Sequence, residues 1–196
     1  SFGRKAPNSA EAAVYEAPGR VVVRDIPKPV IAEDEILIQL VAASICGTDL
    51  RISRYGHFKL PSGQERVLGH EIVGIVAEVG SEVSGFEVGE RVTATPNIGC
   101  GRCQFCRQGL NNMCPDYEAF GVTIDGGFEE FLRVPGFALQ RGNVFKVRSL
   151  DYTLAARATG AGDWRIMLSH ILPNCMAIIV IITAADMASL ILTESI

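Results

Sequence analysis

The run Cys100-Gly-Arg-Cys103-Gln-Phe-Cys106-Arg-Gln-Gly-Leu-Asn-Asn-Met-Cys114 brings four cysteines into one short segment. Two successive C-x-x-C steps and a fourth thiol eight residues on allow the four thiolates to turn toward one centre. A zinc ion accepts four sulfurs in a tetrahedron and keeps no open position, so such a site is structural rather than catalytic. We predict a closed zinc site in a lobe at residues 96–115, with a pair of disulfides as the alternative.

The composition of the chain excludes several classes of function. With 18 Lys and Arg against 22 Asp and Glu, the 196 residues carry no basic excess that would indicate binding of nucleic acid or of an anionic membrane surface. Six cysteines and an N-terminus without an apolar stretch indicate a reducing, cytoplasmic location and thiols that bind metal or stay free. The length allows one or two domains with a sizeable core.

Most of the chain is predicted to be β-structure. Short β-branched or alternating runs bounded by proline or glycine predict strands at residues 13–15, 21–24, 35–41, 71–79, 90–94 and 127–134. Strands at this close spacing, with little helical periodicity between them, favour a mainly β domain at residues 12–148 folded as a partly open β-barrel. Residues 1–11 are expected to form a flexible N-terminus.

The pattern changes after residue 150. A helix is predicted from Asp151, as its N-cap, to Gly160, and a second one over residues 163–170 is expected to end at Leu172-Pro173. Two almost wholly apolar runs follow at 176–183 and 187–192, but Asp186 leaves them short of a membrane span of about 20 residues. We therefore expect a short helical, apolar tail at 151–196. Contact with a membrane would be possible only through this tail, and its exposed apolar surface would promote aggregation.

A second candidate site combines Cys46-Gly-Thr48-Asp49 with Gly69-His70-Glu71. A thiolate, an imidazole and a carboxylate are suitable zinc ligands, and three protein ligands with water give the open geometry of catalytic zinc. Such a zinc ion polarises an alcohol oxygen and lowers its pKa, and the nearby Thr48 hydroxyl can relay the proton. A buried free cysteine and a core histidine are the alternatives for the two residues taken singly.

The context of these motifs resembles the zinc-containing alcohol dehydrogenases, a family of medium-chain dehydrogenases. The resemblance rests on Gly69-His70-Glu71-x-x-Gly74-x₅-Gly80-x-x-Val83, on Cys46-Gly-Thr-Asp49 before it and on the cysteine lobe after it, and it covers about residues 12–148. It implies that the partly open barrel is of the chaperonin-10-like kind. It also implies oxidation of a secondary alcohol, with hydride transfer to NAD(P).

Roles for individual residues follow from the same resemblance. Cys46 and His70 would bind catalytic zinc, with Glu71 beside the metal. Thr48 would belong to a proton relay, and Asp49 would orient the His70 imidazole. Cys100, Cys103, Cys106 and Cys114 match the structural zinc ligands. Arg51 stands where relatives often carry the histidine that ends the relay, and no motif places His57.

The sequence also departs from a complete dehydrogenase of this kind. A nicotinamide-binding Rossmann unit is expected to be absent, because Gly160-Ala-Gly162-Asp-Trp-Arg165 has arginine at the third glycine position and follows no strand. A third ligand for the catalytic zinc has no matching motif, and nothing around Cys175 supports it in that role. An incomplete enzyme and an inactive zinc-stabilised binding module therefore remain alternatives. A homo-oligomer is compatible with the sequence.

The tail has a resemblance of its own. Residues 152–160, with Ala155, Ala156 and Gly160, followed by Leu172 and Pro173, resemble the coupling loop of binding-protein-dependent, peptide-type transporter permeases. Two unrelated families that meet near residue 150 would indicate a chimeric or truncated product. A small helical cap on the barrel is the alternative.

Overall fold

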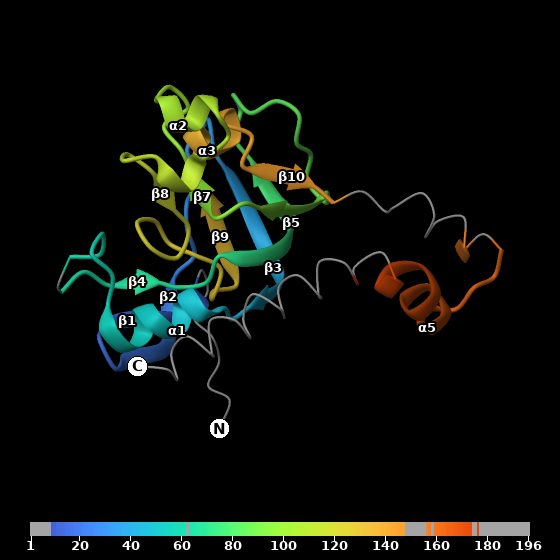
Figure 1. The fold of residues 1–196 in the computed structure, drawn as a ribbon, viewed down its shortest axis with the longest axis horizontal. Helices are drawn as coiled ribbons and strands as arrows, with labels where there is room; N and C mark the ends of the chain where they lie inside the picture. The colour runs from blue at the N-terminus through green and yellow to red at the C-terminus, as the bar shows by residue number, and fades with distance from the viewer. Residues whose placement is uncertain (1–8, 62, 148–155, 158, 174–175, 177–196) are drawn as a thin grey trace, which may run out of the picture. The chain divides into compact units, whose positions relative to one another are not determined.

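A computed structural model describes residues 9–61, 63–147, 156–157, 159–173 and 176 (Figure 1). The chain divides into two compact units, residues 1–147 and 148–196. Each unit is described by itself.

The first unit is built around a five-stranded antiparallel sheet (Figure 1). Its order is β10 (Val144–Lys146), β6 (Arg91–Ala94), β5 (Glu71–Val79), β3 (Ile36–Ser44) and β9 (Phe131–Val134). Alternate residues of β5, including Ile72 and Val76, point inward, and they pack against the buried Ile38, Val92 and Leu132. This alternation is the sequence pattern that predicted the strands.

A three-stranded sheet packs beside the first, in the order β2 (Arg20–Pro27), β1 (Ser9–Ala17) and β4 (Arg66–Val67). The segment just before β9 connects the two sheets: its Phe128 O accepts the N–H of Ala13 on β1 at 2.7 Å, and its Glu130 O accepts the N–H of Leu40 on β3 at 2.9 Å. The described strands form no closed barrel, and the predicted mainly β fold is confirmed. Because β1 begins at Ser9, residues 9–11 of the segment expected to be flexible are paired in this sheet.

Short elements carry the two candidate sites. The helix α1 (Gly47–Tyr55) follows β3, and the cysteine segment contains β7 (Asn97–Ile98), α2 (Gln104–Arg107), the 3₁₀ turn η1 (Asn111–Met113) and β8 (Glu118–Ala119). Figure 1 shows α2 at the top of this unit and α1 at the lower left. The sequence pattern did not predict α1, nor the helix α3 (Gly136–Gln140) that leads into β10.

The predicted strand at 127–134 is a strand only in its second half. Its first residues instead hydrogen-bond a loop, since Gly127 N–H donates to Gly69 O at 2.8 Å and Phe128 N–H donates to Leu68 O at 2.9 Å. Because Leu68 and Gly69 accept these two N–H groups, β9 begins only after them, at Phe131. The same hydrogen bonds hold Gly69, the residue before His70, in place.

In the second unit, the described residues are helical on both sides of Gly160, which has φ 84° and ends a turn that includes Ala156 and Arg157. The helix α5 (Asp163–Ile166) continues into a π-helical turn, η2 (Met167–Ile171). The backbone stays helical through Leu172 and Pro173, where the sequence predicts the end of this helix, and the two residues that follow lie outside the described part of the chain. Asp151 and the two apolar runs lie outside the described residues, apart from Met176.

No helix among the residues that the structure describes is long and apolar enough to cross a membrane.

Candidate functional site

The first candidate site begins with Cys46, which ends the connection from β3 and caps α1. Its backbone is extended, at φ −114° and ψ 175°, and its Sγ accepts a hydrogen bond from Thr48 N–H at 3.3 Å. Asp49, three residues on, completes a capping box by accepting Cys46 N–H at 3.0 Å. The Cys-Gly-Thr-Asp order therefore places a sulfur and a carboxylate side by side at a helix start.

His70 lies between the sulfur and the carboxylate. Its Nε2 is 2.9 Å from Cys46 Sγ, and its buried Nδ1 is 3.4 Å from Asp49 Oδ1. The same Oδ1 accepts Gly69 N–H at 3.1 Å. Asp49 thus contacts the backbone on both sides of the site and the edge of the imidazole opposite Cys46, which is the position expected for a residue that orients the ring.

The ligand atoms of Cys46, Asp49 and His70 all lie within 4.8 Å of one another, and Glu71 is not part of this cluster among the described residues. Glu71, expected beside the metal, is exposed and accepts a hydrogen bond from Ser44 on the neighbouring strand β3. The strand alternation of β5 explains this difference, because adjacent side chains of a strand point to opposite faces. Thr48 is exposed next to the cluster.

The charges of the site are strongly coupled. The Asp49 carboxylate raises the pKa of His70 to about 9, against the opposing effect of burial and with help from the Cys46 thiol. Burial alone would raise the pKa of Asp49, but His70 and the N–H groups of Cys46 and Gly69 lower it. The site therefore favours a carboxylate beside the imidazole.

Cys46 and His70 fit a metal ion through their donor chemistry. Sulfur and Nε2 converge on one side of the imidazole, whereas Asp49 faces Nδ1 on the other side. A zinc ion would thus take two ligands from these residues and leave Asp49 as the partner of the ligand histidine. A cavity of about 450 Å³ adjoins His70, and small side chains such as Ala42, Ala43 and Thr93 line it.

The packing of three glycines holds His70 in place. A Cβ on Gly126 would lie 2.0 Å from Gly69 O, and one on Gly121 would lie 2.8 Å from the same oxygen. Since real Cβ atoms essentially never come this close to backbone, only glycine permits these segments to pack. The Gly69-His70 part of the motif was predicted from the sequence, but the role of Gly121 and Gly126 was not.

His57 lies outside the cluster of candidate ligands formed by the described residues. Its Nδ1 accepts Lys59 N–H at 3.1 Å, and burial together with Arg51 and Lys59 lowers its pKa. A neutral ring that stabilises a turn explains this geometry. Lys59 in turn reaches the cysteine segment, donating to Tyr117 O at 2.9 Å.

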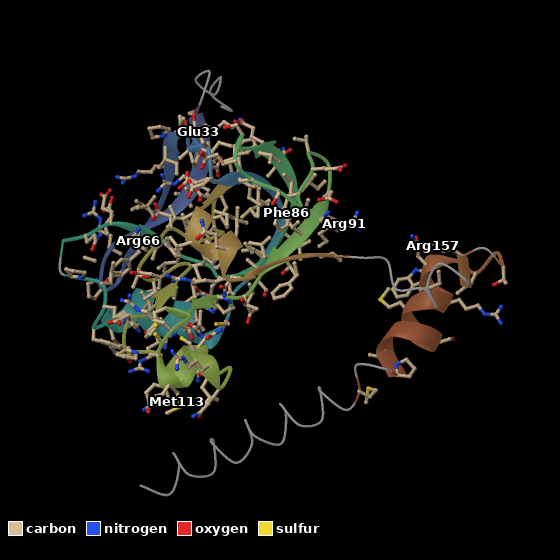
Figure 2. All side chains as sticks on the ribbon, turned by 90° about the horizontal axis from the view of Figure 1, so that it is seen from above. Glu33, Arg66, Phe86, Arg91, Met113 and Arg157 are labelled. Carbon is tan, nitrogen blue, oxygen red and sulfur yellow. The ribbon has the colours of Figure 1, made fainter. Side chains whose placement is uncertain are left out.

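The four cysteines of the lobe come together as predicted, with their sulfur atoms within 4.8 Å of one another. Each of three sulfurs accepts a backbone N–H at 3.4 Å: Cys100 Sγ from Cys103, Cys103 Sγ from Cys106, and Cys114 Sγ from Cys100. The sulfurs of Cys100 and Cys106 are 4.0 Å apart, close to the edge of about 3.8 Å that a tetrahedron with zinc–sulfur bonds of about 2.3 Å would have. Met113 marks this lobe in Figure 2.

The thiols of the lobe differ in their pKa values. The N–H groups of Arg102 and Cys103 lower the pKa of Cys100 to about 6, while burial and the neighbouring thiols raise the pKa of Cys106 to about 11. Several thiolates so close together repel one another, and a dication removes that repulsion. The donor set and its spacing therefore fit a zinc ion with four sulfur ligands.

Known proteins resemble most of the first unit. The family model described as the alcohol dehydrogenase GroES-like domain matches residues 32–141. A second family model, the inner membrane component of binding-protein-dependent transport systems, matches residues 134–196.

Two curated relatives and one solved structure represent the similar proteins. An L-threonine 3-dehydrogenase of Shewanella baltica is 38% identical over 63% of this chain and 35% of its own length. A sorbitol dehydrogenase of Bacillus subtilis is 36% identical over 65% of this chain and 37% of its own. The structure of zinc dependent alcohol dehydrogenase 2 from Streptococcus pneumonia in its apo form is 36% identical, with a TM-score of 0.60, over 72% of this chain and 39% of that one. The chain thus spans a little over a third of the length of these relatives.

Proposed function

Because this chain belongs to the alcohol dehydrogenase GroES-like domain family, we propose that its first unit supplies the catalytic half of a zinc-dependent enzyme that oxidises a secondary alcohol. The observation that carries the proposal is the convergence of Cys46 Sγ and His70 Nε2, 2.9 Å apart, beside a cavity of about 450 Å³. The names of the similar proteins, a threonine and a sorbitol dehydrogenase, support an alcohol group as the site of reaction.

Zinc held by Cys46 and His70 would polarise the alcohol oxygen and lower its pKa. Asp49 keeps the imidazole oriented with Nε2 toward Cys46, through its contact with Nδ1 and its two backbone hydrogen bonds. The Thr48 hydroxyl, exposed beside the cluster, would accept the alcohol proton and pass it to solvent. The hydride would go to NAD(P), as in the dehydrogenases that the sequence resembles.

The tetrad Cys100, Cys103, Cys106 and Cys114 would hold a second zinc ion with no open position, and its role would be to fix the lobe. Through Lys59, which donates to Pro115 O at 3.3 Å, the lobe is connected to the loop that follows α1. Zinc in the tetrad would therefore support the first site without taking part in the reaction.

A chimera tests the proposed activity. Residues 1–147 would replace the matching segment of the Bacillus subtilis sorbitol dehydrogenase, and reduction of NAD⁺ or NADP⁺ would be followed with sorbitol and with other secondary alcohols. We expect oxidation that is lost in Cys46→Ser and kept in Glu82→Gln, which changes an exposed side chain outside the cluster of Cys46, Asp49 and His70. A chimera that folds, binds zinc and oxidises none of the alcohols would contradict the proposal.

For the second unit we propose an origin separate from the dehydrogenase, as a permease-like segment. The transport-system match at residues 134–196 supports it, together with the turn at Gly160 that separates two helical segments. The coding DNA across residues 145–155 tests this proposal. One uninterrupted gene in independent isolates of the source would support a natural fusion, whereas separate genes would identify the junction as an artefact.

A further inference from the structure

A second cavity lies away from both cysteine sites, on the first unit. It measures about 460 Å³, and its walls include the charged residues Arg66, Asp125, Glu129 and Arg133 and the apolar Ile124 and Phe137. Figure 2 labels Arg66, on the strand β4. Neither Cys46 nor His70 belongs to this lining.

Three of the four charged residues already have partners. Arg66 Nη1 is 3.0 Å from Asp125 Oδ1, which also accepts Val67 N–H at 3.1 Å. Arg133 Nη1 is 3.8 Å from Glu35 Oε2. Each arginine thus has a carboxylate partner that offsets its charge, although the buried Arg66 Nε has no hydrogen-bond partner among the described residues.

Glu129 differs from these residues. Its exposed fraction is 9%, and its carboxyl group has no hydrogen bond or ion pair with any residue that the structure describes. Burial and the repulsion of Asp125 raise its pKa to about 8. A buried carboxyl group is costly without a partner, so a ligand that supplies one would gain free energy here.

The surroundings of Glu129 determine the charge of that ligand. Glu129 also lines an adjoining cavity of about 400 Å³, whose walls include Glu11 and Glu130. With Asp125, which is paired with Arg66, three further carboxyl groups line the two cavities that Glu129 borders. A metal ion is a poorer fit, because no group of three potential metal ligands within the described residues includes Glu129.

We propose that the cavity bounded by Arg66, Asp125, Glu129 and Arg133 binds a small organic cation, a primary ammonium with a short apolar body. The ammonium group donates hydrogen bonds to the Glu129 carboxylate, and the apolar body contacts Ile124 and Phe137. The proposal does not depend on the dehydrogenase function, since the cavity shares no residue with the Cys46 and His70 site.

Calorimetric titration of the full chain with n-butylammonium chloride tests the proposal, at pH 9 and with sodium chloride as the ionic-strength blank. We expect saturable binding to the unmodified chain. Glu129→Gln should weaken binding about tenfold or more, because the variant loses one charge-assisted hydrogen bond to the ammonium group. The matched control Glu82→Gln removes an exposed carboxylate elsewhere and should leave the affinity unchanged.

A neutral ligand of the same shape keeps the test independent of how well the variant folds. n-Butanol offers the same apolar body without the charge, so the unmodified chain should bind it at least tenfold more weakly than n-butylammonium. Equal affinities for the two ligands, or a Glu129→Gln variant with circular dichroism and ammonium affinity like those of the unmodified chain, would overturn the proposal.

Discussion

Asp49 is the residue on which the first site depends most, although it faces away from the metal position. Its two oxygens accept the backbone N–H groups of Cys46 and Gly69, and one of them lies beside His70 Nδ1. It therefore fixes the start of α1, the loop before β5 and the imidazole together. The resemblance to the zinc alcohol dehydrogenases predicted the last of these roles, and the capping box that explains the first is visible in the spacing of Cys46 and Asp49.

Replacement of Asp49 should lower the stability of the fold, because Asp49 accepts two backbone hydrogen bonds. Asp49→Ala removes the acceptor of one buried and one part-buried N–H group, and we expect it to lower the free energy of unfolding by about 2–4 kcal/mol, since each unsatisfied donor costs about 1–2 kcal/mol. Asp49→Asn, which keeps one acceptor oxygen, should lose about half as much. Urea denaturation followed by circular dichroism measures both, with Ser53→Ala on the same helix as control. Equal losses for the Ala and Asn variants would argue against this role.

Glu129 should make the stability of the chain depend on pH. Its pKa is raised from 4.5 to about 8 in the fold, where Asp125, Arg66, Arg133, Glu11 and Glu130 face it. The folded state thus binds its proton more tightly than the unfolded state, so this group's contribution is full below pH 4.5 and is lost as the pH rises to about 8.

Urea denaturation at several pH values measures this effect. The stability of the unmodified chain should decline more steeply over this range than that of Glu129→Gln, whose neutral amide does not titrate. Parallel pH profiles for the two proteins would show that Glu129 titrates normally.

At the scale of elements, the position of His70 depends on the contact of two glycine-containing loops. The loop that ends at Gly126 packs on the Gly69 carbonyl so closely that no side chain fits between them. Hydrogen bonds from Gly126 to Val67 O and from Gly127 to Gly69 O fix the same contact. These bonds are also the reason why β9 begins later than its sequence pattern predicts.

A methyl group at Gly126 tests the importance of this contact. Gly126→Ala would place a Cβ 2.0 Å from Gly69 O, so backbone must move, and we expect a loss of roughly 1–3 kcal/mol in unfolding free energy. The chimera that carries this change should also lose alcohol oxidation, because His70 moves with Gly69. Gly162→Ala in the full chain, where a new Cβ meets nothing within 4 Å, is the control for the stability measurement and should leave the unfolding free energy unchanged.

The sequence predicts the strands of the first unit well because each carries a local pattern of alternating burial, as in β5 with Ile72 and Val76 facing the core. It predicts the cysteine lobe from spacing alone, and the lobe forms as expected. It does not predict α1, whose short, mostly polar run has little helical periodicity, nor the position of Glu71, which strand alternation turns toward Ser44. The approach of Gly126 to Gly69 is also invisible in the sequence, because it joins segments far apart in the chain.

At the scale of the whole molecule, the two units match different family models and differ in their secondary structure. The first matches the alcohol dehydrogenase GroES-like domain, and the transport-system match begins only at residue 134. The first unit has its own core, built around Ile36, Ile38 and Leu132. It should therefore fold without the second.

Truncation after Val147 tests this independence. We expect the shortened chain to keep its unfolding free energy and its zinc content, and to elute as a single species in size-exclusion chromatography. The full chain should aggregate more readily, since residues 176–192 are almost wholly apolar in sequence. A shortened chain that precipitates, beside a full chain that stays monodisperse, would show instead that the second unit covers part of the first.

The central claim is that the cysteine tetrad holds zinc with a complete ligand set, whereas Cys46 and His70 provide two ligands of an incomplete one. Zinc content after dialysis against a weak chelator tests this claim most directly, on the unmodified chain, Cys103→Ser and Cys46→Ser. We predict about one zinc per chain, lost in Cys103→Ser and kept in Cys46→Ser. Two tightly held zinc ions in the unmodified chain, or a Cys103→Ser variant that retains its metal, would contradict it.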